Sequence, residues 1–155
     1  MNTRRLAPVA LAAAVLLGAT GCSIISPQAT TIQYSAADGV NIPDSGPVKV
    51  RNALLVTNDE GTAANFIAAL INDTDEPQRI VVGIDGKTAS LRVPARTSLS
   101  LGFDGAEPLL LSDFDGQAGN DVEMSFQSGD GEGVVHSVPV LDGTLPYLTD
   151  FVPAD

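Results

Sequence analysis

Apolar and polar residues alternate along most of the chain, in short runs that turn residues separate. Alternation with a period of two is typical of β-strands that bury one face. The run DVEMSFQ, residues 121–127, is the clearest case. Its apolar residues Val122, Met124 and Phe126 share one face, and the polar residues between them share the other. We therefore expect these three apolar side chains to point into a core.

A second run, AANFIAALIND at residues 63–73, is apolar on both faces. One face carries Phe66, Ala68 and Leu70, and the other carries Ile67, Ala69 and Ile71. A short run with two apolar faces indicates a strand in the middle of a sandwich. Alanine and leucine also favour a helix over TAANFIAALI. The turn sequences NDEG before the run and NDTDEP after it favour the strand.

Five further runs have the composition and length of strands. They are VKVRNALLVT (48–57), QRIVVGI (78–84), TASLRVPA (88–95), TSLSLGF (97–103) and GVVHSVPVL (133–141). The sequence DGK between the second and third of these runs is a hairpin signal. TTIQY, residues 30–34, is a candidate first strand.

Seven to nine short strands with no strong helix predict an all-β protein. We expect an antiparallel β-sandwich of the cupredoxin or immunoglobulin type over residues 30–142. Residues 36–46 and 104–121 are expected to be loops. The last residues, 143–155, contain two prolines and are expected to form an extension that lies against the sandwich.

The first residues have the layout of a secretory signal peptide. Arg4 and Arg5 precede an uncharged run, residues 6–20, that is rich in alanine. A membrane-spanning helix needs about 20 strongly apolar residues, so this run is too short to cross a bilayer comfortably. A basic segment, an apolar segment and small residues in that order are typical of a cleaved leader. We expect residues 1–21 to be that leader, and the sequence leaves Sec and Tat export open.

Cys22 is the only cysteine of the chain, and it follows directly after the small residues Ala19, Thr20 and Gly21. With no second cysteine, a disulfide framework is excluded. The segment GATGC resembles the lipobox of bacterial lipoproteins, in which the cysteine is acylated and becomes the new N-terminus. The resemblance implies lipidation of Cys22, residues 22–29 as a tether, and attachment to the extracytoplasmic face of the cell membrane.

Charge limits the classes of partner. Without residues 1–22 the chain has six basic and 19 acidic residues, a net charge of −13. Nucleic-acid binding needs clustered lysine and arginine, so no nucleic-acid partner is expected. Anionic lipid headgroups would also be repelled, and the lipid on Cys22 is the expected membrane contact. An acidic surface favours solubility and basic partners.

The segments VKVRNALLVTNDEG and AANFIAALINDTDEPQRIVVG lie in the predicted sandwich. They resemble the PCuAC family of periplasmic copper chaperones. The first is similar to the lead-in of its actinobacterial lipoprotein branch, and the second to its strand, acidic turn and strand. LRVPARTSLSL and DVEMSFQSGDGEGVVHSVPVL resemble a later strand pair and the closing hairpin. The likeness covers about residues 45–142. It implies a cupredoxin-like sandwich that is exported and often lipid-anchored.

The copper ligands of that family are methionine and histidine, including a His-x-Met pair in the loop before the closing hairpin. Soft thioether sulfur suits Cu(I). The corresponding residues here, 104–121, contain neither methionine nor histidine. Beyond residue 22 the chain has one of each, Met124 and His136, within predicted strands. We therefore assign no metal ligand and no cofactor, and we do not expect copper as a partner.

Other chemical candidates have plain structural explanations. Met124 alternates with core residues, and His136 is in phase with Val134, Val138 and Val140 on a sheet face. The chain has no Gly-x-Ser-x-Gly motif for a serine nucleophile. The carboxylate pairs Asp59–Glu60 and Asp75–Glu76 stand in turn sequences.

A calcium site is the remaining metal candidate. Asp113, Asp115 and Asp121 carry oxygen ligands of the kind that Ca²⁺ takes. Their spacing does not fit the EF-hand loop, which has a glutamate at its twelfth position. Hairpin turns explain these acidic stretches without a metal, so no catalytic and no metal-binding residue is assigned.

We expect a non-enzymatic, lipid-anchored envelope protein that acts as a binding or interaction module, with an unidentified envelope protein as a possible partner. The alternative is an extracytoplasmic copper chaperone or metal-handling lipoprotein. Its metal site would then be one that the sequence alone does not show. An envelope enzyme is the third class, and no residue of the chain favours it.

Overall fold

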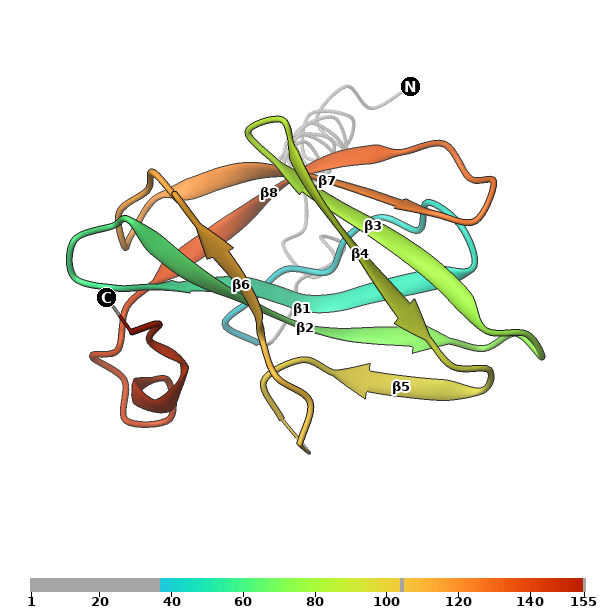
Figure 1. Ribbon diagram of the computed structural model, residues 1–155, viewed down its shortest axis with the longest axis horizontal. Helices are drawn as coiled ribbons and strands as arrows, with labels where there is room; N and C mark the ends of the chain where they lie inside the picture. The colour runs from blue at the N-terminus through green and yellow to red at the C-terminus, as the bar shows by residue number, and fades with distance from the viewer. Residues whose placement is uncertain (1–36, 104, 155) are drawn as a thin grey trace, which may run out of the picture. The chain divides into compact units, whose positions relative to one another are not determined.

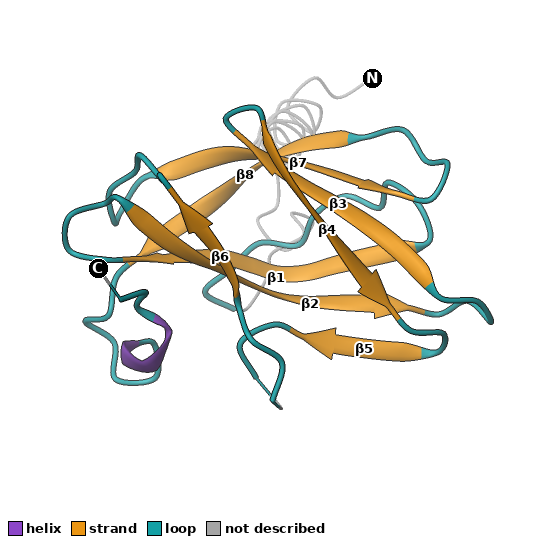
Figure 2. Ribbon diagram, in the orientation of Figure 1, coloured by secondary structure: helices purple, strands orange, loops and turns teal. Residues whose placement is uncertain are grey.

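The computed structural model describes residues 37–103 and 105–154, and their strands form an all-β sandwich (Figure 1). The strands are β1 (Val48–Thr57), β2 (Ala63–Asn72), β3 (Gln78–Ile84), β4 (Lys87–Val93), β5 (Thr97–Ser100), β6 (Leu109–Ser112), β7 (Asp121–Ser128) and β8 (Val134–Leu141). The helix in Figure 2 is one 3₁₀ turn, Thr149–Phe151, near the C-terminus. No helix among the described residues is long and apolar enough to cross a membrane.

The strands follow the order β4-β3-β7-β8-β1-β2-β5, and β6 also pairs with β2. Every pair is antiparallel except β1 and β8, which run parallel. β8 pairs with β7 as far as Pro139 and then with β1 through Val140 and Leu141. Proline has no N–H to donate, so Pro139 suits the point at which β8 changes partner. Through this shared strand the sheet curls into two facing layers, which confirms the predicted sandwich (Figure 1).

The main core lies between the two layers. Met124 and Phe126 of β7 are fully buried, and Val122 is partly buried. The predicted face of β2 is buried as well, and its Phe66 ring lies 6.0 Å from the ring of Phe126, between centroids. The alternation read from the sequence therefore identifies the core residues of both strands.

The opposite face of β1 and β2 has a different cover. Leu54, Val56, Ile67 and Leu148 form a second buried cluster, and Phe151 packs against it. The side-chain amide of Asn65 in β2 donates a hydrogen bond to the carbonyl oxygen of Phe151 (2.9 Å). The segment after β8 thus buries Ile67 on the second apolar face of β2, whereas Ala69 and Ile71 on that face are half-buried. The expected boundary at residue 143 stays a prediction.

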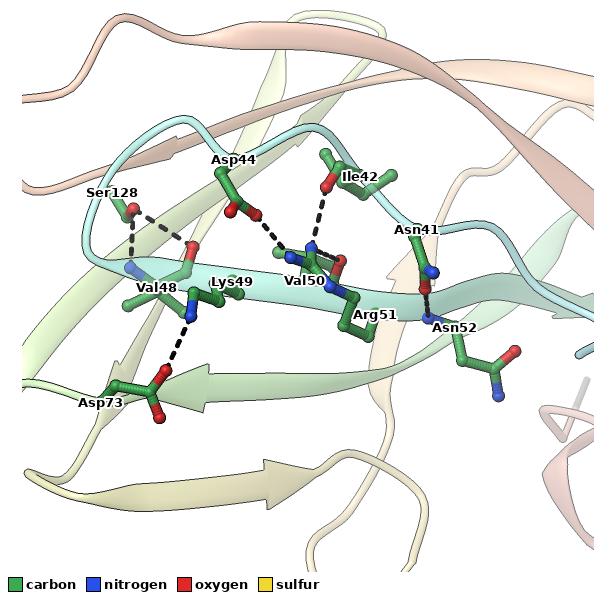
Figure 3. A network of polar contacts seen from close by, with 10 residues as sticks. All are labelled: Asn41, Ile42, Asp44, Val48, Lys49, Val50, Arg51, Asn52, Asp73 and Ser128. Atoms are coloured by element: carbon green, nitrogen blue, oxygen red, sulfur yellow. Dashed lines mark hydrogen bonds and ion pairs between the residues drawn. The ribbon is translucent and has the colours of Figure 1, made fainter. Parts of the chain in front are cut away.

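Residues 37–47 lie along β1 as an irregular segment, as expected (Figure 3). The guanidinium of Arg51 forms an ion pair with Asp44 (2.6 Å) and donates to the carbonyl oxygen of Ile42 (3.0 Å). Asn52 adopts a left-handed conformation (φ 51°), where the pairing register of β1 shifts. Its N–H donates to the side-chain oxygen of Asn41 (3.1 Å). These bonds hold the entry segment against β1.

One strand lies where a loop was expected. Within residues 104–121, Leu109–Ser112 form β6 and pair with Ala63–Phe66 of β2. The run is only four residues long and follows Pro108, so its own pattern is too short to predict a strand. The strand β6 forms because these residues pair with β2. The candidate strand at residues 30–34, the leader 1–21 and the tether 22–29 lie outside the described residues.

Candidate functional site

The register of β7 and β8 places Met124 and His136 directly opposite each other. Opposite residues of an antiparallel pair project from the same face, with Cβ atoms about 4.5–5.5 Å apart. Met124 is fully buried, and His136, in the middle of the β7–β8 ladder, is half-buried. The structure therefore brings together the one methionine and the one histidine of its described residues.

A cavity of about 160 Å³ lies next to Met124, between the β3–β4 hairpin and β6. Its lining includes Val82, Ile84, Leu111, Phe114 and Met124. These residues give the chamber a largely apolar lining, to which Lys87, Ser112 and Asp113 also contribute. A chamber of this kind suits a small apolar group better than a charged one.

An ion pair between two lining residues lies at the rim of this cavity. The ammonium group of Lys87 lies 3.2 Å from a carboxylate oxygen of Asp113, and it also reaches the backbone carbonyls of Ser112 (3.5 Å) and Asp113 (3.4 Å). The contact joins the start of β4 to the end of β6. Both side chains are exposed, so the pair contributes little to stability.

The acidic candidates are not gathered into a metal centre. Asp59–Glu60 and Asp75–Glu76 occupy the turns after β1 and β2, as predicted, and Asp75 pairs with Arg96 (2.8 Å). Asp113, Asp115 and Asp121 are all exposed. Among residues 37–103 and 105–154, no group of three histidine, cysteine or acidic side chains is placed to hold a metal ion.

The pKa shifts belong to surface contacts. The hydrogen bond and charge of Asp73 raise the pKa of Lys49, and Lys49 lowers the pKa of Asp73 in return. The hydrogen bond to Thr144 lowers the pKa of Asp142, and the hydrogen bond to Asp38 raises the pKa of Tyr147. Asp73 and Tyr147 are exposed, and Lys49 and Asp142 are partly exposed, so these shifts mark structural contacts at the surface.

A pair of arginines is the feature that reasoning from the sequence missed. Arg79 on β3 and Arg92 on β4 face each other across the hairpin and line a depression with Pro77 and Gln78. The two-residue turn Asp85–Gly86 sets this register, and both of its residues have positive φ (49° and 77°). Two-residue hairpins with Asp-Gly fix the register of their strands. Counting back from DGK would therefore have found the pair.

The chain was compared with proteins of known family, sequence or structure. No family model and no curated protein matches it. Solved structures do match: the apo PCuAC domain from PmoF1 (22% identity, TM-score 0.51) covers 63% of this chain and 96% of its own. The copper-bound PCuAC domain from PmoF2 (18% identity, TM-score 0.51) covers 64% of this chain and 97% of its own. The resemblance to PCuAC read from the sequence is thus confirmed as a likeness of fold.

Proposed function

We propose that this protein is an exported, lipid-anchored and non-enzymatic binding module of the cell envelope, built on a PCuAC-like sandwich. The observation that carries the proposal is the order of features along the chain. A lone cysteine, Cys22, follows a basic start and an uncharged run, and it precedes one compact β-domain. That domain resembles in fold the copper-bound PCuAC domain from PmoF2.

Covalent lipid supplies an attachment that the protein surface does not. With a net charge of −13 beyond residue 22, the surface is repelled by anionic headgroups. Each buried methylene of an acyl chain contributes about 0.8 kcal/mol, and two or more chains make a durable anchor. Acylated Cys22 would therefore hold the sandwich at the outer face of the cell membrane, where it meets other envelope proteins.

Membrane fractionation with a Cys22→Ser variant tests the anchor. Wild-type protein is expected in the membrane fraction and in the detergent phase of a Triton X-114 partition. The variant is expected in the soluble fraction, or with its leader uncut. Ser23→Ala, one residue further on, is the matched control and should behave as wild type. Identical fractionation and gel mobility of Cys22→Ser and wild type would refute lipidation.

Copper handling is the second candidate function. The cross-strand pair Met124–His136 favours it, because thioether and imidazole are both copper ligands. Two observations weigh against it. The pair supplies at most two ligands, the fewest that tight Cu(I) binding uses, and Met124 is packed in the core. We therefore expect the protein to bind Cu(I) no better than an unrelated acidic protein.

A competition titration against a chromogenic Cu(I) chelator, under reducing conditions, separates the two functions. Wild type, Met124→Leu and His136→Ala are compared. Met124→Leu keeps the volume of the core side chain roughly constant, so it removes the sulfur without a large cavity. One equivalent of copper retained by wild type and lost in both variants would establish copper handling in place of our first proposal.

A further inference from the structure

The basic side chains of this acidic protein divide into two groups. Four of the six within the described ranges form ion pairs: Lys49–Asp73 (2.8 Å), Arg51–Asp44 (2.6 Å), Lys87–Asp113 (3.2 Å) and Arg96–Asp75 (2.8 Å). Arg79 and Arg92 form none with the residues that the structure describes. Acidic residues outnumber basic ones about threefold beyond residue 22, so the absence of a carboxylate beside these two guanidiniums is notable.

The two arginines that form no ion pair are direct neighbours. Arg79 and Arg92 are register partners in the β3–β4 ladder, and both are exposed. Like charges directly opposite each other destabilise an antiparallel pair. One guanidinium N–H of Arg79 reaches the hydroxyl of Ser90 (3.3 Å), which leaves most donors of both side chains free for another partner. An anion placed between them would remove the repulsion.

The two arginines lie beside a surface depression and the free edge of a strand. Arg79, Arg92, Pro77 and Gln78 line one depression of about 210 Å³ on the surface. β4 is the last strand of the sheet on this side, and beyond β3 it has no ladder partner among the described residues. Its outward residues Thr88, Ser90 and Arg92 are exposed and polar. An extended segment can add to such an edge through backbone hydrogen bonds, with side-chain contacts giving specificity.

We propose that the edge of β4 binds an extended, acidic protein segment, and that Arg79 and Arg92 together hold one of its carboxylates. Guanidinium groups match a carboxylate through two parallel hydrogen bonds, which gives the site both charge and geometry. This inference rests on the proposed function as a binding module and names its surface and the chemistry of its partner. The acidic remainder of the domain repels polyanions, so a short segment with few carboxylates fits better than nucleic acid or an anionic membrane.

Fluorescence anisotropy with the full-length lipoprotein in a nonionic detergent tests the site. The probe is a labelled peptide of alternating threonine and glutamate, and its matched partner has glutamine in place of glutamate. The glutamate peptide should bind, and the glutamine peptide should not. Arg79→Gln and Arg92→Gln should each weaken binding about five- to tenfold, as expected for the loss of one hydrogen bond at an exposed site. The affinity should fall as salt is added.

Arg96→Gln is the matched control, because Arg96 is also exposed but already pairs with Asp75. It should leave the peptide affinity unchanged. Without peptide, Arg92→Gln should have the same melting temperature as wild type or a higher one, because it removes a like-charge contact. A lower melting temperature with unchanged peptide affinity would mean that Arg92 has a structural role only, and it would overturn the proposal.

Two other results would also overturn the site. One is equal affinity for the glutamate and glutamine peptides. The other is a preference for inorganic phosphate or for anionic phosphatidylglycerol vesicles over the glutamate peptide. Neither result affects the fractionation of Cys22→Ser. Failure of the carboxylate site and failure of the lipid-anchored module are therefore separate outcomes.

Discussion

The two faces of the β1–β2 pair are buried by different means. On one face the strands β3 and β7 of the opposite layer supply Ile80, Val82, Met124 and Phe126 to one continuous core. On the other face, a smaller cluster is covered by Leu148 and Phe151, which come from a segment with a single 3₁₀ turn (Figure 1). Adjacent residues of one strand, Phe66 and Ile67, therefore belong to different clusters.

The difference lies in how each cover is fastened. The facing layer is part of the same curled sheet, and ladder hydrogen bonds hold it in place. Within the described ranges, two side-chain hydrogen bonds join the C-terminal segment to the rest of the domain: Asn65 to the carbonyl of Phe151 (2.9 Å) and Tyr147 to Asp38 (2.9 Å). The ring of Phe151 also packs edge-on against that of Phe103 (4.9 Å between centroids). Segments with few ties open locally at lower free energy than the global unfolding of the domain. We expect the main core to govern global stability and the C-terminal cover to open by itself.

Phe126→Ala should have the largest effect. The side chain is fully buried against Phe66, and its removal leaves a cavity between the two layers. The free energy of unfolding should fall by about 3–5 kcal/mol. Urea denaturation followed by circular dichroism measures it, and Glu123→Ala, on the exposed face of the same strand, is the control. A loss below about 1 kcal/mol would contradict the burial of this strand face.

Leu148→Ala should have a smaller and more local effect. Leu148 is buried in the second cluster, and truncation should lower stability by about 2–3 kcal/mol, at the low end for leucine. In hydrogen exchange, amides of residues 145–152 should lose protection first, while those of β7 keep theirs. Uniform loss of protection across both regions would show that the two clusters unfold as one unit, and the comparison would fail.

Most of the sandwich could be predicted from the sequence because every strand except β6 carries its own signal. The ends of β1 and β3 match the predicted runs, and the alternation in β7 identifies its core residues. The strand and not the helix was the right interpretation of residues 63–73. β6 and the parallel pairing of β8 with β1 depend on contacts between distant segments. No local pattern encodes such contacts.

The candidate sites also divide into those that local sequence predicts and those that depend on contacts between distant segments. The pairing of Arg79 with Arg92 follows from a short turn and was within reach of the sequence. Met124 and His136 were placed on neighbouring strands, but their direct opposition depends on the register across a longer turn. The apolar cavity combines the β3–β4 hairpin, β6 and β7, and no single run of residues reveals it. Cys22 lies outside the described residues, so its lipidation stays a prediction.

The smallest expected effect concerns the tie between Tyr147 and Asp38. The phenol of Tyr147 donates a hydrogen bond to the carboxylate of Asp38, which raises the pKa of Tyr147 above its ordinary value of 10.0. A raised folded pKa means that the tie contributes its full stability below the unfolded pKa, about 10, and loses it as pH rises through the folded pKa. Alkaline pH should therefore loosen the C-terminal cover and leave the main core unchanged.

Tyrosinate absorbance measures this tie directly. In a Tyr34→Phe background, Tyr147 is the only tyrosine, and it should ionise at higher pH than a free tyrosine. Asp38→Asn in the same background should bring the pKa of Tyr147 back down towards about 10, because the neutral amide does not oppose the phenolate. Amides of residues 145–152 should then exchange slightly faster at neutral pH, and amides of β7 should not change. Ionisation of Tyr147 at the same pH with and without the Asp38 carboxylate would mean that this hydrogen bond does not hold the C-terminal segment in place. The apolar contacts of Leu148 and Phe151, together with the hydrogen bond of Asn65, would then hold it.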